Sequence, residues 1–243
     1  IGMAISTAAF PTLADQAARG DEALAATLRG ALRLIIFLSL PAGIGLALLA
    51  KPLVVVLLQR GAFDVQSSDI TAQALMFYAP ALFAHCGIEI CSRGFYAMGD
   101  TKTPVGFAVL SMLINLTLAA LLVGPLEVRG IALALSLATS VEFFSLLLTL
   151  RSRVPDFLNE SLLEGLGRMA LATAMMGLVA GGSILVLHHG LNLALDVGPQ
   201  ALVIVLVSAA AGAGVYVLAS EGLGLNEPAV LMRRLPVLQR LRR

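Results

Sequence analysis

The sequence predicts an all-α fold, a polytopic membrane helix bundle made of the end of one helix and six complete transmembrane helices. Two features of the composition point to it. Hydrophobic residues make up 58% of the chain and charged residues 13%, whereas soluble domains carry about a quarter charged residues. The mean hydropathy is +0.93. In addition, the apolar residues are grouped in segments of about 20, which is the length that a helix needs to cross a bilayer.

The chain begins with an apolar stretch, residues 1–13, which is too short for a complete span and which we interpret as the end of a helix. Residues 14–29 are polar and rich in alanine, and they predict a surface helix that leads to a first complete span at about residues 30–50. Arg33 lies one turn inside that span. Because Pro41 has no N–H, it should kink the span, and a neighbouring helix can satisfy the carbonyl that it frees.

The middle of the chain predicts three further spans. Residues 53–58 either extend the first span or lie at the interface, and residues 59–69 form a polar loop. The span that follows carries a proline near its middle, Pro80, and the next one ends at Gly124 and Pro125. These spans are expected at about residues 70–93, 104–123 and 130–150.

The second half begins with a charged break, residues 151–168, and then contains two more apolar segments, at about residues 169–187 and 199–220. We therefore expect four regions: a transporter lobe, a cytoplasmic linker, a pair of additional helices and a basic cytoplasmic tail. Their residue ranges are 1–153, 154–168, 169–220 and 221–243.

The basic residues are divided unequally between the two sides of this arrangement. With six spans after the opening helix end, one side receives 13 of the 16 basic residues. Lysine and arginine are enriched in cytoplasmic loops, so that side and the C-terminus should be cytoplasmic. The 13 are Arg19, Arg29, Arg33, Arg93, Lys102, Arg151, Arg153, Arg168, Arg233, Arg234, Arg240, Arg242 and Arg243; the other three are Lys51, Arg60 and Arg129.

A polar segment, residues 93–104, separates two of the longest apolar segments and predicts the hinge of a membrane hairpin. Gly99 and Asp100 can end the first helix. Thr103 or Asp100 can cap the second, with Pro104 in its first turn, where a missing N–H costs little.

The same segment carries a family resemblance. Residues 93–105, RGFYAMGDTKTPV, resemble the signature of the MurJ/MviN family of bacterial lipid II flippases, which belongs to the multidrug, oligosaccharidyl-lipid and polysaccharide exporters. Residues 7–13, 32–34 and 60–64 agree with it, and the similarity is clearest over residues 1–153. The signature residues of the loop are Phe95, Tyr96, Asp100, Thr101, Lys102, Thr103 and Pro104.

The resemblance implies a fold of fourteen helices, of which this chain would hold the end of the eighth and all of the ninth to fourteenth. It implies a multi-pass protein of the bacterial inner membrane that flips lipid II for peptidoglycan biosynthesis by alternating access, and so supports cell-wall biogenesis and cell shape. The partners would be lipid II, membrane lipid and a missing N-terminal half, which in the family carries most of the arginines of the substrate cavity.

His85, Glu89 and Arg93 are spaced by four residues and share one helix face. A charge facing lipid at the centre of a span costs roughly 2.5 to 3.5 kcal/mol, so this face should point into the bundle. It either forms a local Glu89–Arg93 pair at the cytoplasmic end or lines a polar cavity.

Three more polar residues lie in spans and are candidate cavity residues. Glu142 must be paired, neutral or hydrated; it either faces a cavity with an ion-coupling role or is protonated and hydrogen-bonded to a nearby Ser or Thr, such as Ser136. Asn115 is either an interhelical hydrogen-bonding residue or part of a site. Arg33 either anchors the span at the interface or meets an anionic headgroup.

Small residues recur in the last two spans, at Gly177 and Gly181 and at Ser208 and Gly212. This spacing is typical of close helix contact. The family resemblance implies that these helices shape a groove for the lipid tail, and a smooth face would serve either purpose.

The sequence contains no catalytic constellation, metal-ligand cluster or phosphate-binding loop, so we expect no enzyme activity, no metal, no cofactor and no nucleic-acid partner. The alternative function is a drug/cation antiporter or polysaccharide-unit exporter of the same fold, for which Glu89 and Glu142 would supply cation coupling. A third hypothesis is a polytopic enzyme acting on lipid carriers, although its acidic residues would be expected in a cluster.

Overall fold

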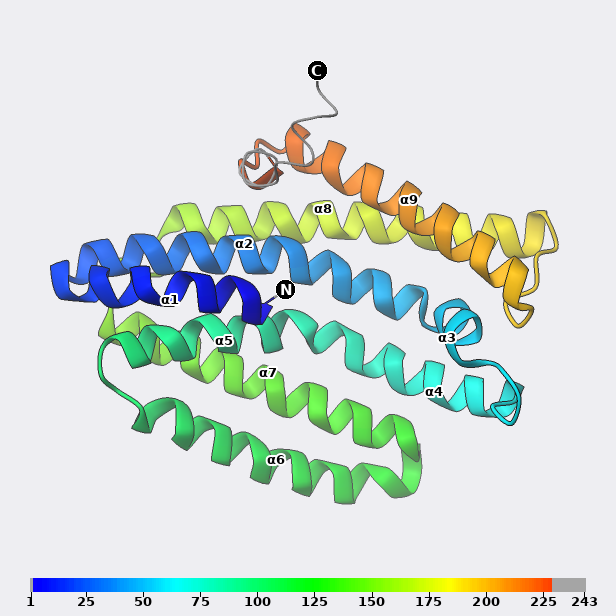
Figure 1. Ribbon diagram of the computed structural model, residues 1–243, viewed down its shortest axis with the longest axis horizontal. Coiled ribbons are helices and arrows are strands. Elements are labelled where there is room, and N and C mark those ends of the chain that lie inside the picture. Colours follow the sequence, from blue (N-terminus) through cyan, green and yellow to red (C-terminus); the bar gives the residue numbers. More distant parts are fainter. Residues whose placement is uncertain (1, 229–243) are drawn as a thin grey trace.

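The computed structural model describes residues 2–228, with side chains from Phe10 onward, and arranges them as a bundle of mostly antiparallel helices (Figure 1). The elements are α1 (Gly2–Arg19), α2 (Asp21–Leu48), α3 (Ala50–Leu58), α4 (Val65–Tyr78), the 3-10 turn η1 (Ala79–Ala81), α5 (Leu82–Ala97), α6 (Lys102–Leu126), α7 (Val128–Arg153), α8 (Glu160–Leu185), the π-helical turn η2 (Val186–Gly190) and α9 (Gly198–Gly222).

The prediction of six complete spans is confirmed. Within the described residues, six helical segments are long and apolar enough to cross a membrane. Two of them combine elements: α4, η1 and α5 form one span, and η2 continues α8. The spans are Asp21–Leu48, Val65–Ala97, Lys102–Leu126, Val128–Arg153, Glu160–Gly190 and Gly198–Gly222.

The prediction of a separate surface helix over residues 14–29 is wrong. Its residues continue the two neighbouring helices, α1 and α2, which meet at Gly20 with a φ of 124°. Because a side chain is strained at such a φ, glycine is the residue that permits this reversal. The alanine-rich sequence favours helix on both sides of it.

The charged linker is also more helical than its composition suggested, because α8 begins at Glu160, well before the predicted span. The Asn159 side chain caps the helix by accepting a hydrogen bond from the Leu162 N–H at 3.0 Å. Only residues 154–159 remain as a connection. The basic residues of the predicted tail, from Arg233 onward, lie outside the described residues.

Two of the prolines inside helical segments, Pro41 and Pro80, each have a hydroxyl donor from a neighbouring helix nearby. Pro41 lies inside α2 and has no N–H to donate to the Phe37 carbonyl four residues earlier. The Tyr216 hydroxyl of α9 donates to that carbonyl at 2.7 Å, which confirms that a neighbouring helix satisfies it. At Pro80 the helix narrows to the η1 turn, and the Ser136 hydroxyl of α7 donates to the Phe77 carbonyl at 2.7 Å.

The hinge between α5 and α6 forms where it was predicted, and of the two candidate caps it is Asp100 that accepts the hydrogen bonds. Gly99 has a φ of 77°, which reverses the chain after α5. The Asp100 carboxylate then accepts hydrogen bonds from the backbone N–H groups of Lys102 and Thr103, at 3.1 and 3.0 Å, and from the Thr103 hydroxyl at 2.7 Å. Thr103 is therefore a donor, and the cap is Asp100, because a carboxylate accepts several hydrogen bonds at once.

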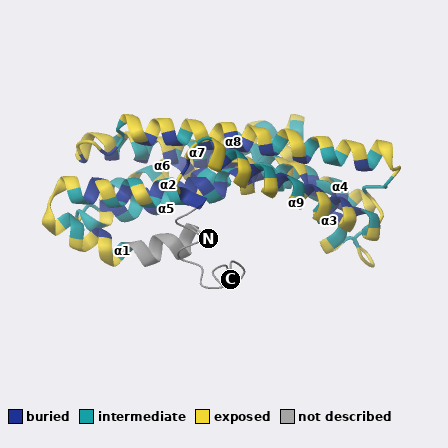
Figure 2. Cartoon of the chain, turned by 90° about the horizontal axis from the view of Figure 1, so that it is seen from above, coloured by how far each residue is buried: buried dark blue, intermediate teal, exposed yellow. Residues whose placement is uncertain are grey.

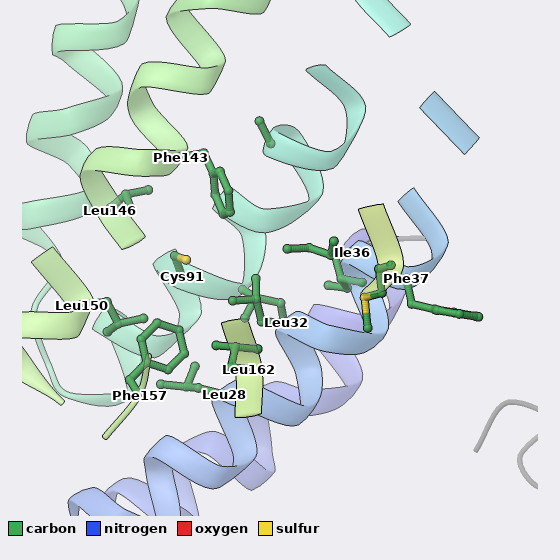
Figure 3. Close-up of a cluster of buried hydrophobic side chains, with 14 of the residues drawn as sticks. Leu28, Leu32, Ile36, Phe37, Cys91, Phe143, Leu146, Leu150, Phe157 and Leu162 are labelled. Atoms are coloured by element: carbon green, nitrogen blue, oxygen red, sulfur yellow. The ribbon is translucent and has the colours of Figure 1, made fainter. Parts of the chain in front are cut away.

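The core lies between α2, α5, α7 and α8, where α5 packs on both α2 and α7 and α2 also packs on α8 (Figure 3). Leu28, Leu32 and Ile36 of α2 point toward Cys91 of α5, Phe143 of α7 and Leu162 of α8. Many exposed side chains away from this centre are large and apolar, and Figure 2 shows exposed residues along the length of the bundle. Of the most apolar 18 residues of α6 only 6% are buried, so most of this helix needs a lipid or protein neighbour outside this chain.

The helix order places the described basic residues as predicted. Arg19, Lys102 and Arg153 lie at helix ends that meet at one end of the bundle, while Lys51 and Arg129 lie at the other end (Figure 1). We call the first the arginine-rich end. There the Arg153 guanidinium lies 3.9 Å from the Asp100 carboxylate.

Candidate lipid groove and polar sites

An apolar groove with a volume of about 720 Å³ runs between α2, α3, α8 and α9. Its walls are almost entirely hydrocarbon, so it suits a flexible apolar chain rather than a polar ligand. The lining residues used below are Phe37, Pro41, Met176, Ala213, Tyr216 and Pro228.

The small residues of α9 give the groove its shape. Ser208 and Gly212 are buried and line it. A Cβ on Gly212 would lie 3.3 Å from the Ala180 Cβ and 3.4 Å from the Met176 Cγ, so the absence of a side chain lets α9 pack closely on α8. The close helix contact is therefore present, and the same residues line the groove; a lipid tail in this groove stays a prediction.

Near the C-terminal end of α9, this helix and the segment after it are joined to α2 by an aromatic contact and an ion pair. The rings of Phe37 and Tyr216 have centroids 5.0 Å apart, beside the hydrogen bond described above. One turn earlier on α2, the Arg33 Nε lies 2.5 Å from the Glu227 Oε1. Pro228, next to Glu227, lines the groove, so this ion pair stands at its end.

The His85 face of α5 lies elsewhere. Its Glu89 and Arg93 form a pair at 3.6 Å, and the Arg93 guanidinium lies 5.9 Å from the ring centroid of Phe10 on α1. The local pair is thus present, and lining of a polar cavity stays a prediction. His85 itself is exposed.

Asn115 of α6 and Glu142 of α7 are half-buried. Within the described residues, no hydrogen bond or ion pair joins Glu142 to another group, and the Asn115 Oδ1 is buried without a partner. The Ser136 hydroxyl, considered as a partner for Glu142, donates to the Phe77 carbonyl. The cavity role of both residues remains a prediction.

The signature residues of the hinge have separate positions. Phe95 is buried in the core, whereas Tyr96, Thr101 and Lys102 are exposed. Hydrogen bonds from the Thr103 backbone and side chain, in that order, hold the pKa of Asp100 below its ordinary value, and the Lys102 backbone and the Arg153 charge act in the same direction. Pro104 is buried in the first turn of α6. These contacts build the hinge itself.

Sequence reasoning did not identify Tyr216 and Glu227. The available signals were the one tyrosine of the last span and a carboxylate a few residues after it. Their partners lie 179 and 194 residues earlier in the chain, and no local pattern connects them.

Comparison with known proteins identifies a family. The family described as "Lipid II flippase MurJ" matches residues 1–196. Three similar proteins are each described as a probable lipid II flippase MurJ. That of Vibrio cholerae is 30% identical over 176 residues, covering 72% of this chain and 34% of the relative. Those of Rhizobium meliloti and Thermotoga maritima are 32% and 31% identical and cover 92% and 96% of this chain, and 42% and 44% of the relatives.

A solved structure described as lipid II flippase MurJ in an inward closed conformation superposes with a TM-score of 0.68 at 22% identity, covering 94% of this chain and 42% of that one. At this identity the match establishes the fold. The chain thus spans between a third and a half of the length of these relatives.

Proposed function

The chain belongs to the MurJ family of lipid II flippases, and from that premise we propose that it forms the carboxyl-terminal part of a transporter that moves lipid II across the bacterial inner membrane by alternating access. The family match over residues 1–196 carries this proposal. A multi-pass bundle with an apolar groove supports it, because lipid II joins a polar headgroup to a long hydrocarbon tail.

In this proposal the groove between α2, α3, α8 and α9 holds the tail while the headgroup crosses beside it. The arginines that bind the headgroup would belong to the half of the transporter that this chain does not contain. The chain would bind and release its cargo without breaking a covalent bond, and no enzyme activity is proposed.

We further propose that the arginine-rich end is cytoplasmic, which follows from the enrichment of basic residues in cytoplasmic loops. Single cysteines placed at Ser152 and at Asn226, in a background without Cys86 and Cys91, should both be protected from a membrane-impermeant thiol reagent in intact cells. Labelling of only one of them would contradict the span assignment.

The function can be tested through the groove. In cells depleted of the protein that contains this chain, lipid II on the outer leaflet should fall, and re-expression should restore it. Ala213→Phe places a ring in the groove and should prevent this rescue at normal abundance. Ala210→Phe is a matched control, because Ala210 is exposed on α9 but does not line the groove. Unchanged lipid II exposure after depletion would contradict the proposed function.

A cation-coupled exporter of the same fold is the second candidate, and Glu142 is the observation that favours it. A half-buried carboxyl in mid-span without an ion pair in the described part of the chain is typical of a proton or cation site. If coupling is its role, Glu142→Gln should abolish ion-driven efflux of a cationic dye. If the protein flips lipid II without this group, the same variant should keep lipid II exposure normal.

A further inference from the structure

The Arg33 guanidinium occupies a site built by three segments of the chain. Its Nε lies 2.5 Å from the Glu227 carboxylate, and its Nη1 donates to the Ser161 carbonyl at 3.4 Å. On α8, Gly165 faces the guanidinium so closely that a Cβ there would lie 3.0 Å from the Arg33 Cζ. The absence of a side chain at Gly165 therefore makes room for the cation.

The carboxylate in this site is incompletely satisfied. Glu227 is 7% exposed, and its Oε2 is buried without a hydrogen-bond partner among residues 10–228. Removing a carboxylate from water costs free energy that the ion pair only partly offsets when one oxygen is left without a donor. Glu227 lies five residues after the end of α9, and its incompletely satisfied carboxylate is a group that another anion could replace at Arg33.

The site also continues into the groove. Arg33 lies one turn before Phe37, and Glu227 precedes Pro228, and both neighbours line the groove. An anionic group bound to Arg33 would therefore have an apolar channel beginning next to it. A lipid has this form, with its phosphate at one end of its hydrocarbon chains, and a guanidinium offers phosphate the forked donors that it also offers a carboxylate.

We propose that Arg33 is a binding site for a lipid-borne phosphate and that the Glu227 carboxylate occupies this site as an internal competitor. The segment after α9 then exchanges with lipid: when Glu227 is bound the site is closed, and when it leaves the phosphate takes its place. The proposal requires a phosphate-bearing lipid and does not require that lipid II be the cargo.

Lipid binding to the purified full chain tests the proposal. Native mass spectrometry in detergent would measure the binding of phosphatidylglycerol, undecaprenyl pyrophosphate and diacylglycerol, which has no phosphate. Glu227→Gln removes the competing charge and should tighten phosphate-lipid binding roughly tenfold, because the fraction of open sites rises. Glu227→Asp keeps the charge but shortens its reach, and should give a smaller gain.

Two controls give the test its meaning. Glu221→Gln changes an exposed carboxylate at the end of α9 and should leave binding unchanged. Arg33→Gln combined with Glu227→Gln should remove the gain in binding. Arg151→Gln combined with Glu227→Gln changes an exposed arginine in the last turn of α7 and should keep the gain. A gain with phosphatidylglycerol identifies ordinary membrane lipid as the ligand, and a gain with only undecaprenyl pyrophosphate identifies the lipid carrier.

Three results would overturn the proposal: no gain with either phosphate lipid, an equal gain with diacylglycerol, or a gain that persists without Arg33. These results are independent of the flipping assay, because lipid II exposure in cells can be normal or lost whether or not Arg33 binds a phosphate.

Discussion

Gly87→Ala should destabilise the bundle through a single pair of residues on α5 and α7. A Cβ at position 87 would overlap the Phe143 ring, with the Cδ2 at 2.7 Å and the Cζ at 2.9 Å, and the Cε2 closer still. Ordinary contacts between carbon atoms are about 3.5 to 4.0 Å, so the ring or the helix would have to move by roughly 1 Å.

The ring has little room for that movement. Phe143 is 2% exposed and packs edge-to-face against Phe83, with centroids 6.0 Å apart, and against Phe144 at 5.2 Å. Overpacking a well-filled core costs typically about 1 to 3 kcal/mol. We expect the upper part of this range, because a buried ring cannot swing away as the end of a flexible side chain can.

The free energy of unfolding in detergent, measured by denaturant titration with circular dichroism, would test this value. Gly106→Ala is the matched control, since a Cβ there meets nothing within 4 Å. Combining Gly87→Ala with Phe143→Leu should cost less than the sum of the two single changes, because the smaller side chain vacates the overlapping space. Additive costs, or a harmless Gly87→Ala, would refute the close packing of α5 on α7.

Three further predictions concern polar groups. Tyr216→Phe should lower the free energy of unfolding by about 0.5 to 1.5 kcal/mol, because it removes the donor to the Phe37 carbonyl. In a Pro41→Ala background, where the substituted residue gives that carbonyl a backbone N–H donor, the same change should cost almost nothing. A double-mutant cycle in the same unfolding assay would measure this difference. Because the pKa of Asp100 is lowered in the folded state, its cap stabilises the fold fully above the ordinary Asp pKa of about 3.9, and this contribution is lost as pH falls through the lower folded pKa. The melting temperature should therefore fall in that acidic range, and Asp100→Asn should make the fall smaller. The same dependence of melting temperature on pH in the variant and the parent would contradict the cap. Glu142→Gln should insert normally, whereas Glu142→Lys should lower abundance, since a charge at mid-span costs roughly 2.5 to 3.5 kcal/mol; normal abundance and activity of the lysine variant would place this residue in water.

The spans could be predicted because their signal is local and tied to a fixed length. A helix must carry about 20 apolar residues to cross a bilayer, whatever it packs against. The same local reasoning failed at Gly20, and at the hinge it could not choose between Thr103 and Asp100 as the cap. The position of a helix end depends on the backbone conformation there and on which side chain accepts hydrogen bonds from the free N–H groups, and sequence spacing decides neither.

The candidate site was less predictable for a physical reason. Arg33 was recognised as a cation near a membrane surface, but the group that it binds depends on how α8 and the segment after α9 fold back onto α2. Such contacts join residues far apart in the chain. The need of Pro41 for a partner was visible in the sequence, whereas the identity of that partner was not.

The bond between Tyr216 and Phe37 also bears on the order of assembly. The acceptor is presented only when α2 is already helical, and turning α2 by one residue, about 100°, would aim it elsewhere. Docking of α9 is therefore favoured, by about 0.5 to 1.5 kcal/mol, when α2 has formed in this rotational register. The N–H that Pro41 lacks thus makes the packing of α9 sensitive to the rotation of α2.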